Sequence, residues 1–349
     1  MTKPLDANIK VKVLSKAHEN EWLRQLPNNQ PYWGNCHFLF DEDERDYNWL
    51  IVYNDLPTSR GERFSINEEL LACSSHNTLL ITTEPSSIKT YGKAFTAQFG
   101  YVLTSQEPWA LPHPQRIYSQ PSLHWFYGLG KDKKIPFNEL LAAKAPQKNK
   151  LISTVCSTKQ QKHTLHNRRY EFTQELKALM PELDIYGHGV IEMDDKAISL
   201  DNYKYHIAIE NHLGLHHWTE KLSDAFLGYT LPFYYGCPNA ADYFPEDSFI
   251  PIDIYDISTA YDCIQKAITD KTYEKKLPAI IEARNRVLHQ YNIFAVIHKI
   301  VNQHQPVNSN NDVNTTIYSR RALRKHRPLV ALEDMTDKLI RPIKKRLYS

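Results

Sequence analysis

The sequence has few cysteines, no long apolar run and none of the glycine-rich phosphate loops of common nucleotide enzymes. Its five cysteines are scattered, odd in number and without CxxC or zinc spacing, so we expect reduced thiols in a cytoplasmic protein. No apolar run approaches the roughly 18 residues of a membrane span, and the stretch MTKPLDANIK lacks the apolar core of a signal peptide. The absence of GxxxxGK[ST] and GxGxxG disfavours a P-loop kinase and a dinucleotide enzyme.

The composition that remains is typical of a globular α/β protein. A chain of 349 residues with 42% hydrophobic and 23% charged residues is long enough for two domains. In its first part, short apolar segments alternate with polar loops, which predicts a doubly wound sheet. The predicted strands there are residues 37–40, 49–53, 78–82 and 101–104, with a short helix at 65–73.

A strand, a loop, a helix and a second strand follow one another between residues 203 and 238. The run 205–209 is apolar and β-rich, Thr219 is a candidate N-cap, and 230–235 is a second apolar run. This order is one unit of a parallel sheet, and open α/β sheets bind ligands where strands end and helices begin. Further upstream we expect a strand at 151–157, a helix at 168–180 and a strand end passing into a glycine turn at 184–189.

Three side chains at that corner suit a phosphorylated ligand. Lys221 adds a full charge to the partial positive charge of the helix N-terminus, which attracts phosphate. Glu220 can accept hydrogen bonds from sugar hydroxyls, and Asn211 can both donate and accept. Together they predict a site for a nucleoside diphosphate linked to a sugar. The alternative, an ordinary capped helix without a ligand, stays open on these residues alone.

The letters ENHLGLHHWTEK at 210–221, LPFYYGCP at 231–238 and PEDSFI at 245–250 form a set of motifs. Together they resemble the signature of family 10 glycosyltransferases, the α1,3/4-fucosyltransferases, and the bacterial members are the most similar. The resemblance covers residues 150 to 300. It implies two Rossmann-like domains facing a cleft (the GT-B type) and an inverting, metal-independent transfer with GDP-fucose as donor and no further cofactor.

The same resemblance implies roles for individual residues. An arginine at the start of the 168–180 helix would contact the diphosphate; Arg169 matches that place best, and Arg168 stays open. With Lys221 it would stabilise the charge that develops on the leaving diphosphate. His217 departs from the family pattern, which leaves the sugar specificity open. The implied donor-binding set is Arg169, Tyr186, Gly187, Glu210, Asn211, His217, Thr219, Glu220 and Lys221.

Glu84 is the candidate catalytic base. It follows the predicted strand 78–82, and an inverting transfer needs a carboxylate to take the proton from the attacking hydroxyl. The resemblance implies a base after a comparable strand of the first domain. Asp55, Glu107 and the acidic run 41–44 are rival bases, and Glu84 could instead cap a following helix. We interpret the acidic run as a solvated loop, so no metal ligand is predicted.

The end of the chain is strongly basic. Residues 319–349 contain ten Lys or Arg and three acidic residues, a net charge of 10 − 3 = +7, with apolar residues interleaved. Such an amphipathic stretch is typical of contact with an anionic membrane surface, here at the inner face of the membrane. A solvated disordered tail and nonspecific nucleic-acid binding are the alternatives, and no specific nucleic acid is expected.

These features predict an acceptor-binding domain at 1–145, a donor-binding domain at 150–305 and a linker with a basic tail at 306–349. The function we expect is transfer of fucose to a hydroxyl of a surface glycan, in lipopolysaccharide or capsule, free or carried on a lipid. The same fold with another nucleotide sugar is one alternative. A noncatalytic glycan- or nucleotide-binding protein is the other.

Overall fold

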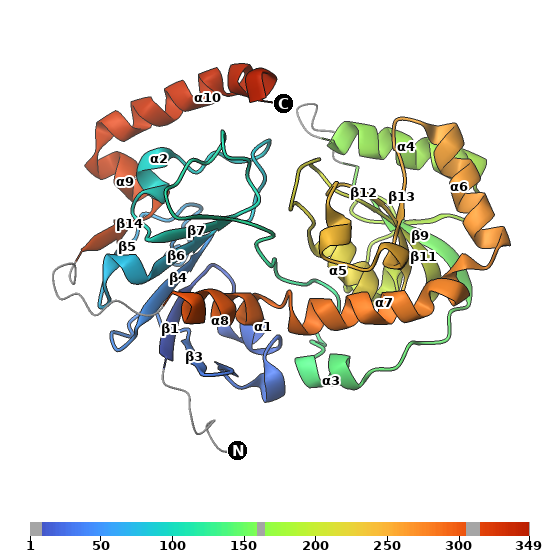
Figure 1. Ribbon diagram of the computed structural model, residues 1–349, viewed down its shortest axis with the longest axis horizontal. Helices are drawn as coiled ribbons and strands as arrows, with labels where there is room; N and C mark the ends of the chain where they lie inside the picture. Colours follow the sequence, from blue (N-terminus) through green and yellow to red (C-terminus); the bar gives the residue numbers. More distant parts are fainter. Residues whose placement is uncertain (1–8, 159–164, 305–314, 349) are drawn as a thin grey trace. The chain divides into compact units, whose positions relative to one another are not determined.

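The computed structural model describes residues 9–158, 165–304 and 315–348, which form two compact units (Figure 1). Unit 1 comprises Met1–Pro121 and Phe294–Ser349, and unit 2 comprises Ser122–Ile293. In the predicted linker and tail at 306–349, residues 306–314 and 349 lie outside the described residues.

Unit 1 is built on a seven-stranded sheet with the order β2-β3-β1-β4-β6-β7-β8. All neighbouring strands run parallel except β2 and β3, as expected for an α/β sheet. The four strands predicted in this part are present within one or two residues of their expected ends. The strands are β1 (Ile9–Leu14), β2 (Tyr32–Trp33), β3 (Cys36–Leu39), β4 (Trp49–Tyr53), β6 (Thr78–Ile81), β7 (Tyr101–Thr104) and β8 (Arg116–Tyr118).

Strand β1 lies inside this sheet although its sequence, IKVKVL, has the alternation of a half-exposed strand. Lys12 is nevertheless fully buried. Its Nζ donates to Glu69 Oε1 at 2.9 Å and to the carbonyl of Glu42 at 2.6 Å. Because both partners come from other segments, the pattern of β1 alone could not reveal that it is central.

The predicted helix at 65–73 is wrong. The segment contains β5 (Glu68–Leu70), which pairs antiparallel with β14 (Thr316–Tyr318) from the other end of the chain. A partner so distant in sequence overrides the local apolar spacing.

The helices of unit 1 complete its core. Phe294 on α8 contacts the rings of Trp22 and Phe38 edge-on, and Leu323 on α9 packs in one cluster with Phe95 on α2. The predicted separate tail is therefore part of unit 1. These helices are α1 (Glu19–Leu23), α2 (Lys93–Thr96), α8 (Ile293–Gln303), α9 (Arg320–His326) and α10 (Pro328–Tyr348).

Unit 2 is built on a five-stranded parallel sheet with the order β10-β9-β11-β12-β13. The predicted strand–helix–strand order is present, and α7 continues through Pro278, although proline commonly breaks a helix. The strands are β9 (Lys150–Val155), β10 (Asp184–Tyr186), β11 (Tyr203–Ile209), β12 (Leu231–Tyr235) and β13 (Ile250–Pro251). The helices are α3 (Phe137–Ala142), α4 (His166–Leu179), α5 (Glu220–Leu227), α6 (Ile257–Thr269) and α7 (Thr272–His289).

The segment after residue 121 belongs to unit 2, whereas the sequence places the boundary at 145–150. The Tyr127 hydroxyl donates to Asp201 at 2.7 Å, and the Phe126 N–H donates to Asp224 at 3.2 Å. These contacts tie the segment to the second sheet although it precedes the predicted linker.

All five cysteines are unpaired thiols. Within the described ranges, no helix combines the length and the apolar character needed to span a bilayer.

Candidate functional site

A cavity of about 350 Å³ lies in unit 2 at the carboxyl ends of β9 and β11. This is the edge of the sheet where ligands of open α/β folds bind. The lining residues are Val155, Ser157, His166, Arg169, Gly187, His188, Met193, Lys196, Ser199, Leu200, His206, Ile207, Ala208, Ile209, Asn211, Glu220, Lys221 and Asp224.

Helix α5 begins at this cavity because Thr219 caps it. The Thr219 backbone is extended, and its Oγ1 accepts from the Lys221 N–H at 3.3 Å. Leu222 and Phe226 are fully buried and fix the helix in the core. The first turn is therefore held with its partial positive charge next to the cavity.

Glu210 supports that cap from behind. It is fully buried; its Oε1 accepts from the Thr219 N–H at 2.8 Å, and its Oε2 accepts from the Thr219 hydroxyl at 2.7 Å. Burial raises the pKa of the Glu210 carboxyl, and Lys221, whose Nζ lies 3.5 Å away, opposes that shift. Glu210 and Thr219 do not line the cavity; they hold the first turn of α5, whose residues Glu220 and Lys221 do line it.

Lys221 and Glu220 form an ion pair at the cavity wall, with Nζ 3.0 Å from Glu220 Oε1. Burial lowers the pKa of Lys221, but Glu220 and Glu210 outweigh it and the pKa is raised. Burial raises the pKa of Glu220, but Lys221 and Lys196 outweigh it and the pKa is lowered. Both side chains are therefore charged near neutral pH.

Sequence reasoning missed two further charged residues of this wall. Lys196 Nζ lies 3.0 Å from Asp224 Oδ2 and 3.5 Å from Glu220 Oε1. Asp224 could have been found, because it stands four residues after Glu220 on the same face of α5. Lys196 could not, because it begins a single 3-10 turn, Lys196–Ser199, between β10 and β11, and so short a turn carries no periodic pattern.

Arg169, rather than Arg168, reaches the cavity. Its Nη1 donates to Asn211 Oδ1 at 3.0 Å, and Nη2 donates to the carbonyl of Val155. Arg168 instead donates through Nε to the carbonyl of Ile254 at 2.8 Å. The structure thus resolves the choice between the two arginines for the cavity and brings Arg169, Asn211 and Lys221 to one wall.

Gly187 and Tyr186 occupy different places. Gly187 lines the cavity with a φ of +136°, and a Cβ there would come within 2.7 Å of the Cys156 carbonyl oxygen. Tyr186 is buried and does not line it; its hydroxyl is 2.7 Å from that of Tyr203. This placement differs from the predicted contact between Tyr186 and a ligand, because the Tyr186 side chain is buried in the protein instead of lining the cavity.

His217 is also buried away from the cavity lining, with its ring edge-on to His212 at 5.3 Å. Three histidines line the cavity, His166, His188 and His206, and the sequence did not single out His206 on β11. Its Nδ1 lies 2.8 Å from Ser153 Oγ. Burial lowers the pKa of His206 to about 3, and the nearby basic side chains add to that shift, so the imidazole is neutral at pH 7.

Glu84 lies in unit 1, just after β6, among polar side chains at the carboxyl ends of β4 and β6. Its N–H donates to the Tyr91 hydroxyl at 3.4 Å, and its carbonyl accepts from Gln106 Nε2 at 2.8 Å. Burial lowers the pKa of Lys89 to about 8, with Arg320 adding to the shift, while the Asp55 and Glu84 carboxylates oppose it.

The rival bases have other surroundings. Asp55 accepts from the N–H groups of Leu56 at 3.0 Å and Arg320 at 3.2 Å, and burial raises its pKa. Asp41 accepts from the Asp43 N–H at 2.9 Å in an exposed turn, as expected for a solvated loop. In the ranges that the structure covers, no group of His, Cys, Asp or Glu could hold a metal ion.

Comparison with known proteins agrees with the motif resemblance. Residues 145–275 match the family model of glycosyltransferase family 10 (fucosyltransferase), C-terminal part. The α-(1,3)-fucosyltransferase FucT of Helicobacter pylori is 34% identical over 85 residues, 22% of this chain and 18% of that protein. The human 4-galactosyl-N-acetylglucosaminide 3-α-L-fucosyltransferase 9 is 27% identical over 161 residues, 43% of this chain and 44% of that protein.

The chain thus spans less than half the length of these curated relatives. Among solved structures, an α1,3-fucosyltransferase with GDP-fucose aligns with 95% of this chain and 92% of its own, at 16% identity and a TM-score of 0.46.

Proposed function

We propose that this chain, whose residues 145–275 match the family model of glycosyltransferase family 10, transfers fucose from GDP-fucose to a hydroxyl of a surface glycan, with inversion. The observation that carries the proposal is the wall of the unit 2 cavity. Arg169 and Lys221 stand there beside the capped N-terminus of α5. A diphosphate bound against this wall meets two cations and the positive end of the α5 dipole.

These groups act on the leaving diphosphate. When the bond from the sugar to the phosphate oxygen breaks, negative charge grows on that oxygen. Arg169 is already held by Asn211 and Val155, and Lys221 by Glu220, so neither has to reorganise during the reaction. We therefore expect metal-independent catalysis. Glu220, which Lys221 and Lys196 keep ionised against the effect of burial, is placed to accept hydrogen bonds from sugar hydroxyls.

Glu84 is the base in this proposal. It would take the proton from the acceptor hydroxyl as that hydroxyl attacks the anomeric carbon opposite the leaving group. Its carboxylate interacts with Lys89, and its backbone is held by Tyr91 and Gln106. The acceptor we propose is a sugar of lipopolysaccharide or capsule.

The test compares Glu84→Gln with Glu107→Gln, since both acidic residues follow strands of the same sheet. GDP release with an oligosaccharide acceptor and binding of GDP are measured for each. Glu84→Gln should lower transfer about a hundredfold or more and leave GDP affinity unchanged, while Glu107→Gln stays near wild type. Loss of transfer in Glu107→Gln alone would show that Glu107, and not Glu84, is the base. A retained anomeric configuration in the product would refute the inverting mechanism.

We place the protein in the cytoplasm, peripheral to the inner face of the membrane. Helix α10 supports this because one of its sides is apolar and faces solvent. Five side chains, each more than half exposed, form that side: Leu329, Leu332, Leu339, Ile343 and Leu347. At 3.6 residues per turn they lie on the same side of the helix. An amphipathic helix with an exposed apolar face and a net basic sequence suits an anionic leaflet. Cosedimentation with anionic vesicles tests this, and Leu339→Ser/Ile343→Ser should abolish it.

A further inference from the structure

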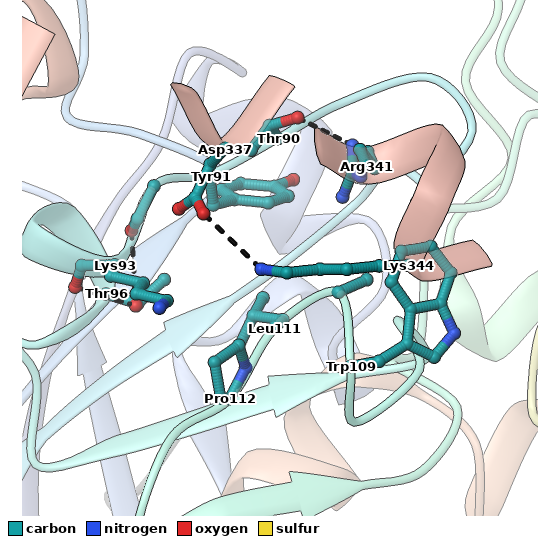
Figure 2. A pocket seen from close by; sticks show the side chains of 12 residues that line it. Thr90, Tyr91, Lys93, Thr96, Trp109, Leu111, Pro112, Asp337, Arg341 and Lys344 are labelled. Atoms are coloured by element: carbon teal, nitrogen blue, oxygen red, sulfur yellow. Dashed lines mark hydrogen bonds and ion pairs between the residues drawn. The ribbon is translucent and has the colours of Figure 1, made fainter. Parts of the chain in front are cut away.

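A small basic pocket lies in unit 1 where the polar side of α10 meets the loops after β6 and β7. Figure 2 shows Lys344 reaching across it between Tyr91 and Leu111 toward Asp337, with Arg341 and Trp109 beside it. The pocket opens to solvent, and its enclosed volume of about 20 Å³ has room for about one water-sized group, such as a single phosphate oxygen. None of its residues belongs to the unit 2 cavity.

Arg341 has unused hydrogen-bonding capacity in this pocket. Its Nη1 donates to Thr90 Oγ1 at 2.6 Å, and its guanidinium carbon lies 6.0 Å from the centre of the Trp109 ring. Its Nη2 is buried and has no hydrogen-bond partner among the described residues. Since a buried donor without a partner costs free energy, a ligand acceptor here would recover it.

Lys344 is also incompletely engaged. Its Nζ donates to Asp337 Oδ1 at 3.5 Å, the long limit of a hydrogen bond, and an ammonium has three N–H donors. With Lys93, the pocket holds three cations. Asp337 and Glu107 are the two carboxylates that interact with Arg341, so the local charge is 3 − 2 = +1. A phosphodiester carries one negative charge and would balance it.

The position of Lys344 on α10 points to the source of that phosphodiester. At 100° per residue, Lys344 stands 40° from Ile340 and 60° from Leu347, both exposed members of the apolar side. A lipid whose phosphate enters the pocket would therefore have its acyl chains beside that side. A sugar phosphate has no chains to place there.

We propose that the pocket formed by Thr90, Trp109, Arg341 and Lys344 binds the phosphodiester headgroup of an anionic glycerophospholipid. This rests on the membrane contact of α10 put forward above and adds a specific site to it. The diffuse charge of the tail attracts any anionic surface. The pocket selects a phosphate that can reach Arg341 Nη2 and Lys344 Nζ together.

The test uses a matched pair of variants of the full chain. Arg341→Gln/Lys344→Gln removes two charges from the pocket, and Lys338→Gln/Arg346→Gln removes two exposed charges of the same helix outside it. Calorimetry measures binding of dihexanoyl phosphatidylglycerol below its micelle concentration, and of inorganic phosphate. Wild type should bind the lipid saturably and more tightly than phosphate. The pocket variant should bind it at least about tenfold more weakly, and the control variant within about twofold of wild type.

Equal loss in both variants would show diffuse attraction and overturn the pocket. Binding of inorganic phosphate as tight as that of the lipid would overturn the lipid assignment. Because Arg341 packs on Trp109, thermal unfolding is recorded for each variant. If Arg341→Gln unfolds the chain, Lys93→Gln/Lys344→Gln replaces it with the same expected loss.

Vesicle cosedimentation separates this inference from the proposed function. If wild type fails to cosediment with vesicles containing phosphatidylglycerol, the membrane contact of α10 is contradicted. The titration with soluble lipid still tests the pocket in that case. Wild type that cosediments, with a pocket variant that binds the short-chain lipid as wild type does, contradicts the pocket alone.

Discussion

Replacing Lys221 by methionine separates two roles of its charge, which are to neutralise buried carboxylates and to bind the diphosphate. Lys221 Nζ stands 3.0 Å from Glu220 Oε1 and 3.5 Å from Glu210 Oε2, and the Glu210 side chain is fully buried. Removing one partner of a buried ion pair costs about 3–5 kcal/mol. Because burial already raises the pKa of Glu210, this carboxyl can take up a proton when Lys221 is gone, so we expect the lower end, about 3 kcal/mol.

The effect on the ligand is separate. A hydrogen bond from an ammonium to phosphate contributes about 1.5–3 kcal/mol, so GDP affinity should fall about ten- to hundredfold. Transfer should fall by about a hundredfold or more, because a preorganised donor to the leaving group is lost. Urea unfolding, calorimetry with GDP and an assay of GDP release measure the three quantities.

The double variant Glu210→Gln/Lys221→Met is the control for stability. It removes the buried carboxylate together with its counter-charge, so much of the unfolding free energy should return while GDP affinity and transfer stay low. A folded Lys221→Met protein that binds GDP within about threefold of wild type and transfers at a near-normal rate would refute the reasoning.

Three further predictions follow from the same cavity. Arg169→Gln should weaken GDP binding about tenfold or more by calorimetry, whereas Arg168→Gln should not change it; equal effects would reject the assignment. Gly187→Ala should lower the unfolding free energy by about 1–3 kcal/mol and weaken GDP binding, because its φ is +136° and its Cβ would meet a carbonyl at 2.7 Å; an unchanged melting temperature would contradict this. Burial lowers the folded pKa of His206 to about 3, so only the unfolded state gains its proton below about pH 6.5. Stability should fall with acid by up to about 1.4 kcal/mol per pH unit from this group, and His206→Gln should reduce that slope; an unchanged slope would contradict this.

Local chemistry explains what could be read from the sequence. The Thr219 cap and the first turn of α5 depend on residues next to one another in the chain, so the pattern TEK predicts the structure that forms. Strand β11 is recognisable because it is buried on both faces and ends in the apolar run 207–209.

Tertiary contacts explain what could not be read. Lys196 enters the cavity wall from a 3-10 turn too short to show a periodic pattern, and Asp224 holds it there. Tyr186 and His217 are named by the resemblance, but their side chains are buried away from the cavity lining.

Tertiary contacts also explain why the sequence could not predict the structure of segment 65–73 and of the C-terminal helix. The segment 65–73 forms a strand only because residues 316–318 pair with it. Helix α10 runs through Pro342, a residue that suggests an interruption, and its polar side packs on unit 1 through Asp334 and Arg341.

The central claim is that the wall formed by Arg169, Lys221 and the start of α5 binds the diphosphate of a GDP-sugar. The most direct measurement is thermal-shift binding of wild type and Arg169→Gln with GDP, GDP-fucose, UDP-, CMP- and TDP-sugars, each with and without EDTA. The account predicts selective stabilisation of wild type by GDP and GDP-fucose, unchanged by EDTA and reduced in Arg169→Gln. Stabilisation by none of these ligands, or stabilisation that Arg169→Gln retains in full, would contradict it.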